Sequence, residues 1–424
     1  MAPVILPQEL IEMIVDQLHT SFNSLLSCHL VSHSFLHRAR YHVWSLVNID
    51  KINQYSLYFE RTACDASAFA KLLQSSECVL GKEYALGSSI KSLNIHTHFF
   101  GFPVLDVHQF GRLLEWLPSL RSIFISNVRI SSSPSPSDPV GAIGEPDPGI
   151  RKRHAIHTLE LHNIFSNTSR DICMLIALFS TIRSIVFHDA APPSKRQESS
   201  LDDALDLSVS TAAPRTQADE LFLGLGFPPE QISLVLGALS LKDIRSVTLR
   251  CPLTFDEACP LLDAIAPVVQ HLSIRPKYIK DSSNTNWPLP AFIRLRSLSI
   301  RLYFVNANDR YERTRLWEIA VSIISSVAAS ASPLLETLTF ELGSHYRGID
   351  IVKCAPRRKI SESVLQLTAA QASERRLTSL SVHWAVLYSR NENEADDSGR
   401  RRRIAENELN AVLHEGGPRV FVRF

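Results

Sequence analysis

Two glycines, at positions 224 and 226, lie in the segment of this 424-residue chain that is most suggestive of cofactor chemistry. They follow an apolar segment ending at Leu223 and precede a segment with helical spacing, as in a turn that binds a dinucleotide pyrophosphate. Pro229 occupies the position of the third glycine, and the next apolar segment ends at Arg250 rather than at an acid. A glycine turn between structural units explains this segment better, so no cofactor site is predicted.

Sixteen histidines provide several pairs that could place two imidazoles near a metal ion. His29, His33 and His37 recur at every fourth position, but they straddle the break between two expected helices. His96 and His98 lie on the same side of an expected strand, with no third ligand nearby in the sequence. A structural zinc needs four ligands and a catalytic zinc needs three, so no metal site is predicted.

The sequence contains no G-x-S-x-G elbow, P-loop, H-E-x-x-H pair or cysteine-nucleophile signature, so we predict no catalytic residues and no enzyme activity. Basic clusters at 151–153 and 400–403 are short and lie in expected loops. We interpret them as solvent-exposed loop residues, with a nuclear import signal as the alternative. A net charge of +1 argues against a general nucleic-acid binder.

A short pattern, apolar-x-x-apolar-x-apolar, recurs ten times from residue 90 onward. Its last two apolar positions alternate with polar ones, which is typical of a half-buried strand. Between these segments, apolar residues recur at the i, i+3, i+4, i+7 spacing of amphipathic helices, in segments that include Phe110, Ile172, Ile232, Ala258 and Ile323. The ten expected strand segments span 90–95, 120–125, 156–161, 182–187, 218–223, 244–249, 269–274, 295–300, 335–340 and 377–382.

Each strand–helix unit must stack on its neighbours to bury its helix, and successive strands begin 25 to 42 residues apart. This part of the chain resembles a leucine-rich repeat. The resemblance implies an α/β solenoid with a parallel sheet on its concave side and helices outside. The family's asparagine, eight residues after the first leucine, is absent at positions 98, 128, 164, 190 and 252, so we expect an irregular solenoid.

The N-terminal segment reads as three short helices. Pro7 suits a first helical turn, and Ile11, Ile14, Val15 and Leu18 have the spacing of one apolar helix face. The segment resembles the F-box, in the divergent form common in fungal proteins, although many members have Cys at the position of Ser32 and Trp at that of Phe35. The matching residues are Leu6-Pro7-Gln8-Glu9-Leu10, Ile14, Leu18, Leu25-Leu26, Leu30-Val31-Ser32, an aromatic at 35 and Trp44.

The F-box resemblance implies a non-catalytic substrate receptor of an SCF-type (cullin–RING) ubiquitin ligase, which docks on a Skp-type adaptor. The adaptor-binding residues would also supply the module's own small core, and the sequence leaves the division between these two roles open. An alternative remains, in which the helices only cap a repeat scaffold that has no ubiquitin-ligase role. The expected adaptor-binding residues are Leu6, Pro7, Leu10, Ile14, Leu18, Leu26, Leu30 and Val31.

The residue after the third apolar position of each repeat is expected on the open face of the sheet. Three consecutive repeats have arginine there, and their charges would repel across strands about 4.8 Å apart unless an acidic or phosphorylated segment of a protein substrate lay against them. Alternatively, the arginines extend into solvent or pair with acids in neighbouring loops. The expected substrate-binding residues are Phe222, Thr248, Arg250, His271, Arg275, Ser299 and Arg301.

We therefore predict an F-box-like helical module (1–50), a helical connection (51–89) and a leucine-rich-repeat-like solenoid (90–424) with mobile insertions near 131–149, 190–216 and 391–403. Seven scattered cysteines without a C-x-x-C pair favour a reducing compartment. The sequence shows no signal-peptide pattern and no run of eighteen apolar residues. We expect a cytoplasmic or nuclear protein that is neither secreted nor membrane-spanning.

Overall fold

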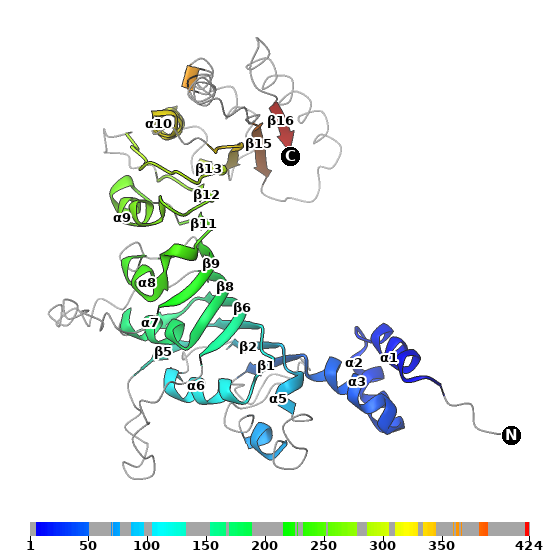
Figure 1. Cartoon of the computed structure of the whole chain (residues 1–424). Coiled ribbons are helices and arrows are strands. Elements are labelled where there is room, and N and C mark those ends of the chain that lie inside the picture. The colour runs from blue at the N-terminus through cyan, green and yellow to red at the C-terminus, as the bar shows by residue number, and fades with distance from the viewer. Residues whose placement is uncertain are drawn as a thin grey trace. The chain divides into compact units, whose positions relative to one another are not determined.

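Parallel strands alternating with helices make up most of the described chain in a computed structural model (Figure 1). This arrangement confirms the predicted α/β class with a mostly parallel sheet. The chain divides into two compact units, Met1–Thr216 and Gln217–Phe424. The structure describes residues 6–50, 69, 71–76, 86–96, 104–132, 153–166, 169–188, 215–224, 227, 232–251, 253–277, 286–304, 310–329, 334–344, 359, 362, 363, 366, 381–388 and 420–423.

The first unit begins with three helices, α1 (Gln8–Gln17), α2 (Phe22–Val31) and α3 (His33–Trp44). Pro7 is the N-cap of α1, and its carbonyl accepts hydrogen bonds from the N–H groups of Leu10 and Ile11. Each helix contributes to one small apolar cluster, which consists of Val15, Leu25, Cys28, Ala39 and Val43. Leu18, Phe35 and Trp44 are half-buried against this cluster, and because such short helices bury little surface, other apolar side chains of α1 and α2 remain exposed.

Residues 46–50, which sequence patterning assigns to the helical module, form strand β1 (Leu46–Asp50) instead. This strand pairs in parallel with β2 (Ser92–His96), and Val47 and Ile49 are buried. The carbonyl of Ser45 accepts hydrogen bonds from the N–H groups of Lys91 and Ser92. The apolar–polar alternation of residues 47–49 is the period of a strand, and it favours the sheet over a helix.

The main sheet of the first unit has the order β1-β2-β4-β6-β8, with β4 (Ser122–Ser126), β6 (His154–His162) and β8 (Phe179–His188). Every pairing along this order is parallel. The short helix α5 (Leu86–Ser89) precedes β2. Helices α6 (Val107–Glu115) and α7 (Ser169–Ala177) lie on one side of the strands (Figure 1).

A second, smaller parallel sheet was not expected from the sequence. It consists of β3 (Val104–Asp106), β5 (Arg129–Ser131) and β7 (Phe165–Ser166). Asn127 and Asn163, at the turns that precede β5 and β7, have left-handed φ angles of 55° and 47°. The side-chain amide of Asn163 donates to Oδ1 of Asn127 at 2.7 Å. Asparagine tolerates this backbone region better than most residues, which explains its use at both turns.

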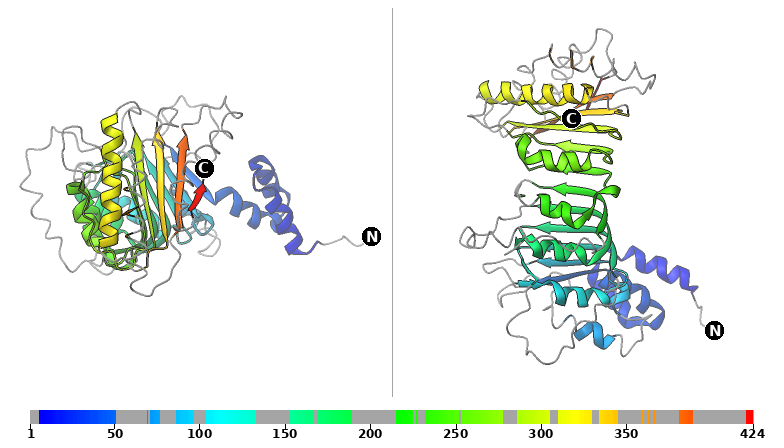
Figure 2. Two further views of the ribbon diagram at one scale, coloured as in Figure 1. Left: turned by 90° about the horizontal axis from the view of Figure 1, so that it is seen from above. Right: turned by 60° about the vertical axis from the view of Figure 1, so that its left-hand side comes forward.

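The strands of the second unit are β9 (Thr216–Leu223), which begins at the unit boundary, β10 (Leu239–Ser240), β11 (Ser246–Leu249), β12 (His271–Ile274), β13 (Ser297–Phe304), β14 (Thr337–Ser344), β15 (Ser381–Tyr388) and β16 (Val420–Arg423). The order is β9-β11-β12-β13-β14-β15-β16, with β10 beside β9, and the successive pairs along it are parallel. Figure 2 shows that the helices of this unit lie on one side of its strands; they are α8 (Ile232–Ala238), α9 (Phe255–Ile265) and α10 (Arg310–Ala329). A 3₁₀ turn, η3 (Leu241–Asp243), precedes β11.

Apolar packing fixes α10 against the strands of the second unit. Trp317 of α10 is fully buried, and its ring centroid lies 6.5 Å from that of Phe304 and 6.2 Å from that of Phe340. Aromatic rings at these separations contribute to packing beyond the area they bury. Thr254 begins α9 with a capping box, in which Thr254 and Glu257 each accept a hydrogen bond from the other's backbone N–H.

All ten predicted strand segments overlap a strand of the structure, and the five predicted helices correspond to α6–α10. The alternating apolar residues near the end of the chain form β16. The predicted insertions near 131–149 and 190–216 lie outside the described residues except at their edges, and the insertion near 391–403 lies entirely outside them. Only residues 69, 71–76 and 86–89 of the predicted 51–89 connection are described.

Candidate functional site

Large apolar side chains are exposed mainly in α1 and α2. Seven of the eleven such side chains in the described part of the chain belong to residues 6–31, and Leu30 is the most exposed at 88%. Proteins rarely leave apolar side chains concentrated in this way unless a partner covers them. We call this set the N-terminal apolar surface; it comprises Leu6, Leu10, Met13, Ile14, Leu26, Leu30 and Val31.

The structure divides the expected adaptor-binding residues between surface and core. Six of them belong to the N-terminal apolar surface, and Pro7 is also exposed. Leu18 is half-buried against the cluster that contains Val15 and Leu25. The expectation that Ile14 shares one face with Ile11 and Val15 is wrong, because Ile14 is 46% exposed and the other two are buried. Leu10 and Ile14 are four residues apart in α1, which makes a second, outward stripe, and Leu6 precedes the helix.

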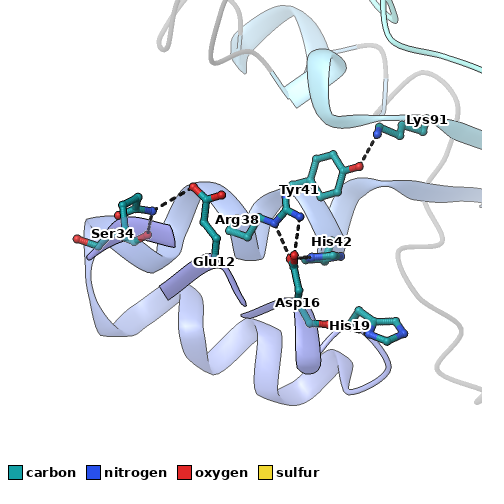
Figure 3. A network of polar contacts seen from close by, with 9 residues as sticks. Glu12, Asp16, His19, Ser34, Arg38, Tyr41, His42 and Lys91 are labelled. Carbon is teal, nitrogen blue, oxygen red and sulfur yellow. Dashed lines mark hydrogen bonds and ion pairs between the residues drawn. The ribbon is translucent and has the colours of Figure 1, made fainter. Parts of the chain in front are cut away.

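A polar network joins α1 to α3 and holds the two helices in place (Figure 3). Nε and Nη2 of Arg38 donate to the two carboxylate oxygens of Asp16 at 2.5 and 2.7 Å, and Nε2 of His42 lies 2.7 Å from Oδ1. The hydrogen bonds from Arg38, and then that from His42, hold the pKa of Asp16 well below its usual range. Gln8 donates to the carbonyl of Ser34 at 3.1 Å, which adds a second tie between the same helices.

The same network reaches from α3 to the residue before β2. Nζ of Lys91 donates to the hydroxyl of Tyr41 and lies 4.5 Å from the centroid of its ring (Figure 3). The guanidinium of Arg38 lies 4.9 Å from the centroid of the Tyr41 ring. These cation–π contacts and hydrogen bonds connect the helices to the sheet through side chains distinct from those of the N-terminal apolar surface.

The expected arginine row consists of Arg250, Arg275 and Arg301. Arg250 and Arg275 directly follow β11 and β12, and Arg301 lies within β13. Along β13, Leu298 and Ile300 are buried while Ser299 and Arg301 are half-buried, so the predicted alternation is observed. Arg250 is exposed and Arg275 is half-buried. Nη1 of Arg275 donates weakly to the carbonyl of Arg250 at 3.5 Å, which places the two neighbouring repeats in contact.

Two of these arginines stack on aromatic rings. The guanidinium carbon of Arg250 lies 4.9 Å from the ring centroid of Phe222, and that of Arg275 lies 4.4 Å from the ring centroid of Tyr303. Partial desolvation and then the charge of Arg301 lower the pKa of Arg250. Desolvation is also the main cause that lowers the pKa of Arg275. Each guanidinium has five N–H donors, so an arginine that lies over a ring can still donate to an acceptor.

The third arginine already has an internal partner. Arg301 is in register with Glu341 on the neighbouring strand, and both its Nε and Nη2 donate to Oε2 of Glu341. The two side chains are 15% and 19% exposed. Oε1 of Glu341 accepts a hydrogen bond from Ser299 at 2.9 Å. The three arginines are therefore not equivalent: Arg250 and Arg275 lie over aromatic rings, and the charge of Arg301 is paired with that of Glu341.

The other expected substrate-binding residues surround this row. His271 is exposed, and Thr248 and Phe222 are half-buried. Thr248 pairs in register with Phe222 on β9 and with Ser273 on β12. Tyr303 and Met13 belong to these two surfaces but were not predicted from the sequence. Tyr303 follows Arg301 by two residues on the same face of β13, so strand period could have identified it.

Comparison with protein-family models finds no matching family, and comparison with curated proteins finds no match. Among the described residues, no helix is both long and apolar enough to cross a membrane.

Proposed function

We propose that this protein is a substrate receptor of an SCF-type ubiquitin ligase, with α1–α3 as an F-box-like module that binds a Skp-type adaptor. The observation that carries the proposal is the N-terminal apolar surface. Six of its seven exposed apolar side chains lie on helices that already have their own buried cluster, and the seventh, Leu6, precedes α1. A helical cap that only protects a repeat domain would direct its apolar residues inward, and would not need a second, outward stripe.

The repeated strand–helix units support the second half of the proposal. Parallel strands joined through helices cross over with one hand, so successive units would curve into a leucine-rich-repeat-like solenoid with its sheet on the concave side. A protein substrate would lie on the open face of the sheet. Arg250 and Arg275 would contact an acidic or phosphorylated segment of that substrate, because guanidinium groups bind carboxylate and phosphate oxygens in pairs. Other subunits of the ligase would carry out every catalytic step.

Capture from cell extract tests this proposal. The full chain is compared with a chain that begins at Ser45, since a cut there removes α1–α3 but keeps β1 in the sheet. We expect the full chain to retain a Skp-type adaptor and a cullin, and the shortened chain to retain neither while keeping its other bound proteins. If both chains retain the same proteins and neither retains an adaptor, the protein is a repeat scaffold with a helical cap.

A further inference from the structure

Three side chains that can ligate a metal ion lie together in the sheet of the first unit. They are Glu160 and His162 of β6 and His188 of β8. His162 and His188 are cross-strand partners in register. Glu160 precedes His162 by two residues, so the three side chains project from the same face of the sheet. Paired strands, rather than a loop, therefore fix their relative positions.

The distances between the ligand atoms are close to those of a metal site. One nitrogen or oxygen from each residue lies within 4.8 Å of those from the other two. Nε2 of His162 and Oε1 of Glu160 are 4.0 Å apart. Tetrahedral zinc with bonds of about 2.1 Å would hold its ligand atoms roughly 3.4 Å apart. Side-chain rotation can close differences of this size without moving the strands.

The surroundings give an ion access and hold the imidazoles in place. The side chains of His162 and Glu160 are 33% and 38% exposed, so the site borders solvent, although the Nε2 atom of His162 is itself buried. The ring centroid of His162 lies 4.2 Å from that of His188 and 4.8 Å from that of Phe124. Packing on both sides restricts the His162 ring, so metal binding costs less side-chain conformational entropy.

We propose that Glu160, His162 and His188 bind a divalent transition-metal ion of the zinc class. Two imidazoles and one carboxylate suit zinc, and they leave a fourth position open to water or to a side chain of a bound protein. The ion would link β6 to β8. This site uses none of the residues assigned to adaptor or substrate binding, so the metal-site proposal can be tested independently of the ubiquitin-ligase proposal.

Calorimetric titration of the full chain with zinc chloride tests the site. We expect one zinc equivalent to be lost from the titration, or its affinity to fall by more than about tenfold, in His162→Gln and in His188→Gln, since each removes a ligand. Glutamine keeps much of the bulk of the ring. Glu160→Gln should weaken binding less. His157→Gln is the matched control, because His157 is an exposed histidine on the same strand.

Cysteines elsewhere in the chain can also bind zinc, so a second measurement separates the two sources. Cobalt substitution reports the ligand type, because a thiolate ligand adds an intense near-ultraviolet charge-transfer band that imidazole and carboxylate ligands lack. We expect a cobalt d–d spectrum without that band, present in His157→Gln and absent in His162→Gln. Zinc should also raise the melting temperature of the wild type but not that of His188→Gln. Equal zinc and cobalt binding by the wild type and all variants would overturn the proposal, as would no binding at all.

Discussion

Arg301 of β13 donates two hydrogen bonds to a single carboxylate oxygen of Glu341, its cross-strand partner on β14. Both side chains are mostly buried, so the loss of either partner leaves a charge with poor solvation. We predict that Glu341→Gln lowers the free energy of unfolding by roughly 1–3 kcal/mol. A double-mutant cycle with Arg301→Met in chemical denaturation should give a coupling energy clearly above zero. A coupling energy of zero would show that the interaction between Arg301 and Glu341 does not stabilise the fold.

Arg250 and Arg275 should contribute more than Arg301 to binding an acidic segment, because Arg301 is already paired with Glu341. Arg250→Glu combined with Arg275→Glu should weaken binding of a fluorescent peptide rich in glutamate and phosphoserine by more than about tenfold, through loss of charge-assisted hydrogen bonds. Fluorescence anisotropy at two salt concentrations measures the effect. Arg245→Glu combined with Arg294→Glu is the control for net charge, because both arginines are exposed outside the row. If the control weakens peptide binding equally, the peptide is held by non-specific electrostatic attraction rather than by a site at Arg250 and Arg275.

Asp16 makes the packing of α1 on α3 dependent on pH. Its folded-state pKa is depressed by the hydrogen bonds from Arg38 and His42, so its contribution to stability is present above the unfolded value of about 3.9. That contribution is lost as the pH falls from about 4 toward the folded value. Asp16→Asn should therefore melt at a lower temperature than the wild type at pH 7, with the difference shrinking at pH 2.5. The same difference at both pH values would contradict this assignment.

The turn at Asn163 should require both its backbone conformation and its side-chain amide. Asn163→Ala places an alanine at a φ of 47° and removes the hydrogen bond to Asn127, at a cost of about 2 kcal/mol in the free energy of unfolding. Asn163→Gly removes only the hydrogen bond and should cost less. Denaturant unfolding of the full chain measures both. If glycine is as destabilising as alanine, backbone strain has no part in the effect.

Strong periodicity made the main strands and helices predictable. Leu298 and Ile300 are buried on β13, as the alternation requires, and the same phase placed Arg301 on the other face. The small sheet could not be predicted, because β3, β5 and β7 contain only two or three residues each and show no period. The asparagines at 127 and 163 were missed because the repeat pattern places its asparagine one residue later.

Partners far apart in the sequence were harder to predict. Glu341 lies 40 residues after Arg301, and only the strand register brings the two together. The same holds for His162 and His188. In the N-terminal helices, apolar spacing predicted an amphipathic face but did not separate Ile14, which is exposed, from Val15, which is fully buried. Adjacent positions on a short helix can face the core and the surface, and the packing of α1 against α2 and α3 distinguishes them.

Titration of a purified Skp-type adaptor into the full chain tests the central claim most directly. Leu10→Glu combined with Leu30→Glu places two charges on the N-terminal apolar surface without touching the buried cluster. Val104→Glu combined with Ile293→Glu, at residues 61% and 56% exposed outside α1–α3, is the matched control. We predict binding by the wild type and by the control, and an affinity at least about tenfold lower for the double variant at unchanged helix content. An adaptor that binds all three proteins equally, or none of them, would contradict the proposed role of α1–α3.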